Sequence, residues 1–187
     1  VGPIDVPSHT HLIFEKGSVL DYVDDFEAYP PIHTRWEGVC CWAMHPCFLI
    51  NNADDVVVEG SGTLNGHGQR WWDYIWKWKN GGRPAAPSLP IEKRLAGLNP
   101  NYLNEPGGGG GRPCQFLRPA LLQILDSKNI RIDGITLVDS PFWTIHPINS
   151  TNLLFKDIVI SNPADSPNTD GIDIESCVNV EVRGCDI

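Results

Sequence analysis

Apolar and polar positions alternate in three nine-residue segments of the second half of the chain, 129–137, 152–160 and 179–187. Each segment opens with Asn and has apolar residues at its second, fourth, seventh and ninth places. Alternation with period 2 predicts short strands rather than helices. The apolar positions are Ile130, Ile132, Ile135 and Leu137, then Leu153, Phe155, Ile158 and Ile160, then Val180, Val182, Cys185 and Ile187.

The three segments begin 23 and then 27 residues apart. A repeat of this length built from short strands is typical of a solenoid, in which each coil packs against the next. Leucine-rich repeats share the period but need a fixed leucine scaffold, which these segments lack. We therefore expect an all-β fold, a parallel β-helix, in which Asn or Cys can form ladders at the turns.

Two earlier segments fit the same scheme. Residues 54–64 place Val56 and Val58 towards the interior with a glycine at the turn, and residues 9–20 supply the first strands under an N-terminal cap. The chain then forms a single domain, residues 1–187. We also expect the solenoid to be truncated, because the chain ends on a predicted strand with no cap to cover its edge.

The middle of the chain departs from the repeat. Residues 69–82 carry Trp72, Ile75 and Trp76 at helical spacing, which predicts a short helix whose aromatic residues pack on the solenoid. Residues 83–113 are rich in Pro, Gly and Asn and predict a long loop, within an inserted loop region of residues 77–113. This is not a phosphate-binding loop, because no Gly-Lys-Ser/Thr sequence follows its glycines.

Composition narrows the possible functions. The 187 residues are 41% hydrophobic and carry a net charge of −9, which argues against a nucleic-acid partner because such proteins need a basic face. No apolar run is long enough for a membrane span. The six cysteines match neither a tight disulfide framework nor a zinc motif, so we interpret them as small buried hydrophobic residues.

The densest group of candidate chemistry lies in residues 166–176, which hold Asn168, Asp170, Asp173 and Glu175. Carboxylates this close indicate acid/base chemistry, a cation site or a strained loop. Period-2 alternation puts Asp173 and Glu175 on the same face of the chain. We expect Glu175 to be solvated, and the alternative role for Asp170 is an Asx-turn that closes a corner.

Five motifs occur in a recognisable order. They are TRWEG (34–38), GSGTLNGHGQRWWD (60–73), an Arg-Pro near residue 112, SPFWTIHP (140–147) and PNTDGIDIESC (167–177). Together they resemble glycoside hydrolase family 28, the polygalacturonases and related pectin hydrolases. The resemblance covers nearly the whole chain. It implies a right-handed parallel β-helix that needs no cofactor and no metal.

The resemblance also implies a reaction, the hydrolysis of α-1,4-glycosidic bonds of galacturonan by an inverting general acid/base mechanism. Asp170 then belongs to the water-activating set, with Asn168 and Asp173 in substrate binding. Of the family's catalytic motifs NTD, GDD, GHG and RIK, only NTD is present in its place, and GDD is expected about one coil after Asp170, past Ile187. We therefore expect residues 1–187 alone to be incomplete and inactive.

The tripeptide Gly66-His67-Gly68 matches the letters of the family's catalytic GHG. It precedes the NTD motif, however, whereas the family's histidine motif follows it. We therefore interpret the tripeptide as a turn, in which the glycines supply the positive φ angles of a tight corner.

Trp143 and His146 lie one coil before Asp170, at the corresponding part of the repeat. A Trp there can stack on a sugar ring, and a His can hydrogen-bond a hydroxyl or carboxylate, so both are candidates for substrate binding. The alternative is core packing for the aromatic residue and a satisfied buried histidine. Arg112 and Arg118 are weaker candidates for binding uronate carboxylates.

The expected partner is a pectic polysaccharide or oligogalacturonide, bound by a protein that is monomeric when complete and is secreted or periplasmic, as the resemblance implies. Two alternatives remain open. A pectate lyase-like β-helix would bind Ca²⁺ through several Asp residues and release an unsaturated product. A non-catalytic carbohydrate-binding or adhesion β-helix would bind glycan without cleaving it.

Overall fold

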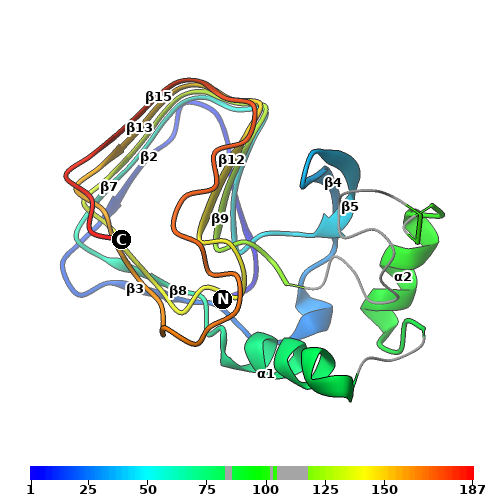
Figure 1. The fold of residues 1–187 in the computed structure, drawn as a ribbon. Coiled ribbons are helices and arrows are strands. Elements are labelled where there is room, and N and C mark those ends of the chain that lie inside the picture. The colour runs from blue at the N-terminus through cyan, green and yellow to red at the C-terminus, as the bar shows by residue number, and fades with distance from the viewer. Residues whose placement is uncertain (83–85, 102, 105–117) are drawn as a thin grey trace.

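Three parallel β-sheets wind around one core in the computed structural model, which describes residues 1–82, 86–101, 103–104 and 118–187. Successive coils contribute strands to each sheet in turn and stack in parallel register, so the fold is the expected right-handed parallel β-helix (Figure 1). The first sheet has the order β1 (Ile4–Val6), β6 (Phe48–Asn51), β9 (Leu122–Leu125), β12 (Ile145–Ile148). The second has the order β15 (Val178–Arg183), β13 (Thr151–Lys156), β10 (Lys128–Asp133), β7 (Asp54–Gly60), β2 (His11–Phe14). The third has the order β14 (Val159–Ser161), β11 (Thr136–Val138), β8 (Thr63–Asn65), β3 (Val19–Asp21).

The predicted repeat is confirmed by the strand register. Ile130 pairs with Val56 on one side and with Leu153 on the other, and Leu153 pairs with Val180. Ile130, Val56 and Leu153 are all buried, so residues at equivalent places of successive coils stack inside the β-helix. In the last coil the equivalent positions are more exposed, and Ile187 is 65% exposed.

An asparagine ladder marks the start of the second sheet. Asn129, Asn152 and Asn179 all have φ near +58°, a left-handed conformation that Asn tolerates better than most residues. The Nδ2 of Asn179 donates to Oδ1 of Asn152, and Nδ2 of Asn152 donates to Oδ1 of Asn129, at 3.1 and 3.0 Å. Asn129 in turn donates to the carboxylates of Asp54 and Asp55. The ladder thus ties coils together along one corner.

The chain leaves the β-helix for a β-hairpin, β4 (Pro31–Trp36) and β5 (Val39–Met44), which follows the short 3₁₀ helix η1 (Phe26–Ala28). The turn residues Glu37 and Gly38 both have positive φ, 48° and 83°, as a two-residue hairpin turn requires. The hairpin lies beside the outer face of the first sheet, next to β9 and β12 (Figure 1).

A helix follows β8, as predicted, and forms α1 (Gln69–Lys77), which continues into the irregular turn η2 (Trp78–Gly82). The buried face of α1 contains Trp71 in place of the predicted Trp76. Trp71, Trp72 and Ile75 are buried, whereas Trp76 is 39% exposed and its Nε1 donates to the carbonyl of Asp165. The physical reason is that Trp71 packs against the ring of Phe26 at 4.4 Å, which places the contact one position earlier on the helix.

The predicted loop 77–113 contains a second helix, α2 (Pro90–Leu98), so the prediction of an unstructured insertion was wrong there. Ile91 and Leu95 are fully buried one helical turn apart. Glu92 accepts hydrogen bonds from the backbone N–H groups of Ser88 and Leu89 and from Tyr74 of α1, which fixes the start of the helix. Arg112, Cys114 and the five glycines of the predicted loop lie outside the described residues.

The described cysteines fall into three environments, so their interpretation as buried hydrophobic residues holds only in part. Cys41 and Cys47 are buried, Cys177 and Cys185 are partly exposed on the last coil, and Cys40 is exposed. Cys40 and Cys41 differ because they alternate across the hairpin strand β5. No helix within the described ranges combines the length and the apolar character that a membrane span needs.

Candidate active site

The longest connections of the β-helix all lie at one corner, where the chain passes from the third sheet to the next strand of the first sheet. These connections are residues 22–47, 66–121 and 162–171. The last of them contains Asn168 and Asp170. Loops on a rigid scaffold are where binding and catalytic residues concentrate. The outer face of the first sheet and these connections therefore define the candidate active site.

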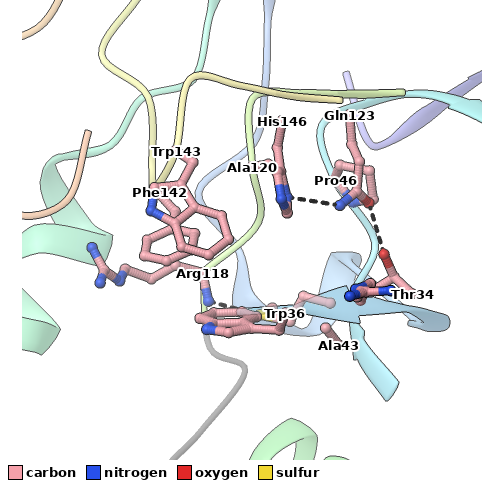
Figure 2. A pocket seen from close by; sticks show the side chains of 12 residues that line it. Thr34, Trp36, Ala43, Pro46, Arg118, Ala120, Gln123, Phe142, Trp143 and His146 are labelled. Atoms are coloured by element: carbon pink, nitrogen blue, oxygen red, sulfur yellow. Dashed lines mark hydrogen bonds between the residues drawn. The ribbon is translucent and has the colours of Figure 1, made fainter. Parts of the chain in front are cut away.

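A narrow pocket lies between the β4–β5 hairpin and the outer face of the first sheet. One wall is aromatic: the rings of Trp36 and Phe142 stack at 4.7 Å, and Trp143 lies 4.3 Å from Phe142 (Figure 2). The ring of His146 meets Trp143 edge-on at 4.6 Å. The predicted neighbours Trp143 and His146 therefore both line this pocket.

A chain of hydrogen bonds crosses the pocket floor. Thr34 Oγ1 on the hairpin donates to Gln123 Oε1, and Gln123 Nε2 lies 3.2 Å from His146 Nδ1 (Figure 2). Because the Gln123 amide nitrogen can only donate, Nδ1 of His146 accepts and Nε2 carries the proton. That Nε2 faces Glu175 Oε2 at 3.4 Å. The buried histidine is thus satisfied at both ring nitrogens.

Burial lowers the pKa of His146, and the nearby charge of Glu175 offsets this effect only in part. His146 is 3% exposed and stays neutral at neutral pH, so it acts as a hydrogen-bonding group and not as a cation. Glu175 also pairs with Arg35 Nε of the hairpin. The expectation that Glu175 is solvated was therefore wrong, because the folded hairpin brings Arg35 over a carboxylate that is distant in sequence.

Asp173 lies beside His146 in the stacked coils. Ile145 bridges to Ile172 and Ile148 to Glu175, so the intervening residues of the two coils run side by side. Burial, together with the smaller effect of the nearby charge of Asp170, raises the pKa of Asp173 to about 6. Within the described residues, Oδ2 of Asp173 is buried without a hydrogen-bond partner. Asp170 and Asp173 therefore form an electrostatically linked pair in contrasting surroundings.

Asp170 itself is exposed, and its backbone carbonyl accepts a hydrogen bond from Thr144 N of the preceding coil at 2.8 Å. Two residues earlier, Asn168 adopts φ +57° and accepts a hydrogen bond from Arg118 Nη2 at 2.9 Å. Arg118 was expected to be a candidate for binding uronate carboxylates. The structure instead buries it to 6% exposure and directs its guanidinium at the NTD segment.

The Gly66-His67-Gly68 tripeptide forms a turn between β8 and α1, away from the pocket. His67 Nε2 lies 2.9 Å from Asp21 Oδ1, beside the third sheet. The positive φ belongs to His67, at 47°, and not to the glycines. The glycines are required for space, because a Cβ on Gly66 would lie 2.6 Å from the Asp139 carbonyl and one on Gly68 would lie 2.4 Å from the Trp72 ring.

Sequence reasoning missed three polar residues of this site, Thr34, Arg35 and Gln123, and it also missed that Glu175 is paired. Gln123 lies 23 residues before His146, the same offset as one pair of repeats, and this spacing is the signal that could have found it. Thr34 and Arg35 lie in a hairpin outside the repeat, so no periodic signal could place them. No group of three or more metal-ligating side chains occurs in the part of the chain that the structure describes.

The family model and the most similar curated proteins all point to the same family of enzymes. The family model for glycosyl hydrolases family 28 matches residues 109–187. A probable polygalacturonase of Vitis vinifera is 28% identical over 98% of this chain and 32% of its own length. A polygalacturonase of Juniperus ashei is also 28% identical, over 97% of this chain and 28% of its own length. This chain thus spans about a third of the length of these relatives.

Solved structures show the same similarity. An exopolygalacturonase from Thermotoga maritima superposes with a TM-score of 0.75 and 30% identity, over 98% of this chain and 41% of that one. A polygalacturonase from Erwinia carotovora superposes with a TM-score of 0.69 over 98% of this chain and 43% of that one. At 21% identity the second comparison supports the fold alone.

Proposed function

This chain belongs to glycosyl hydrolases family 28, and on that premise we propose that it forms part of an enzyme that hydrolyses the α-1,4-glycosidic bonds of galacturonan. The substrate is a pectic polysaccharide or an oligogalacturonide. The names of the relatives, which are polygalacturonases and an exopolygalacturonase, support this choice of substrate. The complete protein acts as a monomer, outside the cell or in the periplasm, without a cofactor.

The observation that carries the proposal is the pairing of Asp170 with Asp173 beside the aromatic pocket. Hydrolysis with inversion needs one carboxyl group that donates a proton and another that activates water, about 6.5–9.5 Å apart. Asp170 and Asp173 lie on the same coil, and a carboxylate on a neighbouring coil, about 4.8 Å away, would also be held at such a separation by the strand that carries it. We assign Asp170 to the water-activating set, as the family resemblance implies, and its side chain is exposed and lines an open hollow together with Asn168 and Asn162.

The remaining residues bind and orient the sugar in this proposal. Trp143 offers an aromatic face to a sugar ring, and His146, fixed by Gln123 and Glu175, keeps a constant orientation below it. Asn168 has its amide oxygen engaged by Arg118, which leaves its amide nitrogen to donate to a sugar hydroxyl. Asp173, with its raised pKa, contributes a carboxyl group that is protonated more readily than an exposed one.

Replacement of Asp170 by Asn tests the proposal. We expect Asp170→Asn in the complete protein to lower kcat on polygalacturonate by about 10²–10⁴-fold, since this is the usual contribution of an acid/base group. Release of reducing ends measures the rate. Circular dichroism is expected to be unchanged, because Asp170 is exposed and its backbone contact with Thr144 is retained.

Asp126→Asn is the matched control, because Asp126 is also an exposed corner residue, with φ +48°, but lies at the far end of β9. It should retain full activity. Retention of more than about a tenth of the parental rate by Asp170→Asn would reject the assignment of Asp170. A product that absorbs in the ultraviolet and disappears with a chelator would indicate lyase chemistry. Binding without turnover in the parent would indicate a non-catalytic glycan-binding protein.

A further inference from the structure

Arg118 is a charged residue that is buried beside the candidate active site. The side chain is 6% exposed, and it lies four residues before β9, at the edge of the first sheet. A guanidinium group taken out of water requires several hydrogen bonds to compensate for lost hydration. The identity of its partners therefore indicates what this arginine does.

Both terminal nitrogens of Arg118 point at the segment 167–168. Nη1 donates to the carbonyl of Pro167 at 2.6 Å, and Nη2 donates to Oδ1 of Asn168 at 2.9 Å. The flat face of the guanidinium lies 4.5 Å from the centre of the Phe142 ring (Figure 2). A planar group with two parallel donors can serve both acceptors at once, whereas a lysine ammonium cannot reproduce this geometry.

The segment 167–170 is anchored at its other end by the preceding coil. Thr144 N donates to the carbonyl of Asp170, and Asn162 Nδ2 donates to the carbonyl of Thr169 at 3.2 Å. Asn168 stands between these anchors in a left-handed conformation, with φ +57°. Among the hydrogen bonds of the described residues, those from Arg118 hold Pro167 and Asn168, so the loss of Arg118 would release the first half of the segment.

The backbone of Arg118 is itself unusual. Its φ is +126°, a region that residues other than glycine rarely adopt. Its N–H is directed at the sulfur of Met44 at the end of β5. The surrounding structure therefore fixes the direction of the side chain from several sides, as is common for residues that position a functional site.

We propose that Arg118 is a positioning residue that holds Asn168, and through it Asp170, in the orientation needed for hydrolysis, without contacting the substrate. This inference rests on the proposed function of Asp170. A displacement of about 1 Å can cost about 10²-fold in rate, because catalytic groups must lie in line with the reacting bond. The effect of losing Arg118 should therefore fall on kcat and not on KM.

The experiment compares Arg118→Lys and Asn168→Gly in the complete protein on polygalacturonate. Glycine suits the φ of Asn168, so the second variant removes the acceptor without adding backbone strain. We expect Arg118→Lys to lower kcat at least tenfold with KM changed by less than about threefold. Asn168→Gly should lower kcat by a similar factor and also raise KM, because it loses the proposed contact with the sugar as well. The kcat of the double variant should lie within about twofold of the kcat of the less active single variant, because both changes break the same interaction.

Arg131→Lys is the matched control, since Arg131 forms ion pairs with Glu59 and Asp133 on the outer face of the second sheet, far from the pocket. It should keep the parental kcat. Unchanged kcat in both test variants, a rise in KM alone, or additive losses in the double variant would each overturn the proposal. If Arg118→Lys does not fold, Asn168→Gly decides alone by the same criteria. Asp170→Asn is measured in parallel. If this variant keeps the parental kcat, the proposed function has failed, and the result is then not attributed to the role of Arg118.

Discussion

Three acidic residues within six positions of the chain have different surroundings. Asp170 is exposed, Asp173 is partly buried with an unpartnered oxygen, and Glu175 is paired with Arg35 and His146. Sequence distance does not determine these differences, since Glu175 meets Arg35 of the hairpin and His146 of the preceding coil, whereas the Asp170 side chain faces solvent. The pKa of a carboxyl group follows these surroundings because burial disfavours its charged form and cations favour it.

The raised pKa of Asp173 predicts a pH-dependent cost to stability. The carboxyl ionises near pH 4 in the unfolded chain and near 6 in the folded one, so ionisation between these values favours unfolding. The destabilisation is absent below about pH 4 and complete above about pH 6. We expect Asp173→Asn to raise the free energy of unfolding at pH 7.5 by at most about 3 kcal/mol, and to have little effect at pH 3.5.

Urea denaturation of both proteins at the two pH values measures this difference. Asp126→Asn, at an exposed corner, should change the free energy of unfolding by less than about 0.5 kcal/mol at either pH. An equal effect of Asp173→Asn at pH 3.5 and 7.5 would show that packing, and not ionisation, causes the change.

Among the elements, the corner that opens the second sheet depends most directly on residue type. Asn129, Asn152 and Asn179 combine a left-handed backbone with side-chain hydrogen bonds between successive coils. Asn meets both requirements because its short amide tolerates this conformation and can donate and accept at once. The asparagine at the start of each repeat thus has a physical explanation in the stacking of coils.

Two substitutions at Asn152 separate the two contributions. Asn152→Gly loses the ladder hydrogen bonds but keeps the backbone conformation, and should cost about 1 kcal/mol. Asn152→Ala adds the left-handed penalty and should cost about 1–2 kcal/mol more. Thermal and urea unfolding measure both. If alanine is no worse than glycine, the left-handed conformation contributes nothing to the requirement for asparagine.

At the scale of the whole molecule, the β4–β5 hairpin and the β-helix are joined by polar contacts across the pocket. Arg35 pairs with Glu175, Thr34 hydrogen-bonds Gln123, and Trp36 stacks on Phe142. These contacts connect the hairpin with three parts of the β-helix, namely β9 through Gln123, the segment before β12 through Phe142, and the coil after the NTD segment through Glu175. The pocket therefore exists only when the hairpin is docked.

Weakening this connection should loosen the hairpin selectively. In Glu175→Gln, the loss of charge weakens the contact with Arg35, and we expect amide exchange in β4 and β5 to accelerate about tenfold or more, since hydrogen bonds to charged groups contribute roughly 1.5–3 kcal/mol. Exchange in the second sheet should not change. Glu59→Gln, which weakens ion pairs with Arg131 and His11 on that sheet, is the control and should leave the hairpin unaffected. Equal protection of the hairpin in parent and Glu175→Gln would exclude this role for Glu175.

The strands of the repeat could be predicted from the sequence because their signal is local. Ile130, Leu153 and Val180 alternate with polar residues and recur at nearly constant offsets, and the register of the coils follows these offsets. Helix α2 could not be recognised as easily, since proline and glycine flank it and its capping carboxylate, Glu92, depends on Tyr74 of another helix. The hairpin had no repeat to mark it.

Period and alternation act along the chain, so they were enough to predict the β-helix, the coil that carries Asp170 and Asp173, and the position of Trp143 and His146 one coil earlier. The groups that surround these residues could be found only from the folded molecule. Arg35 reaches Glu175, Gln123 orients His146, and Arg118 holds Asn168 because insertions of the β-helix fold back over its first sheet. Such contacts depend on how the insertions dock, and no local pattern of residues encodes that geometry.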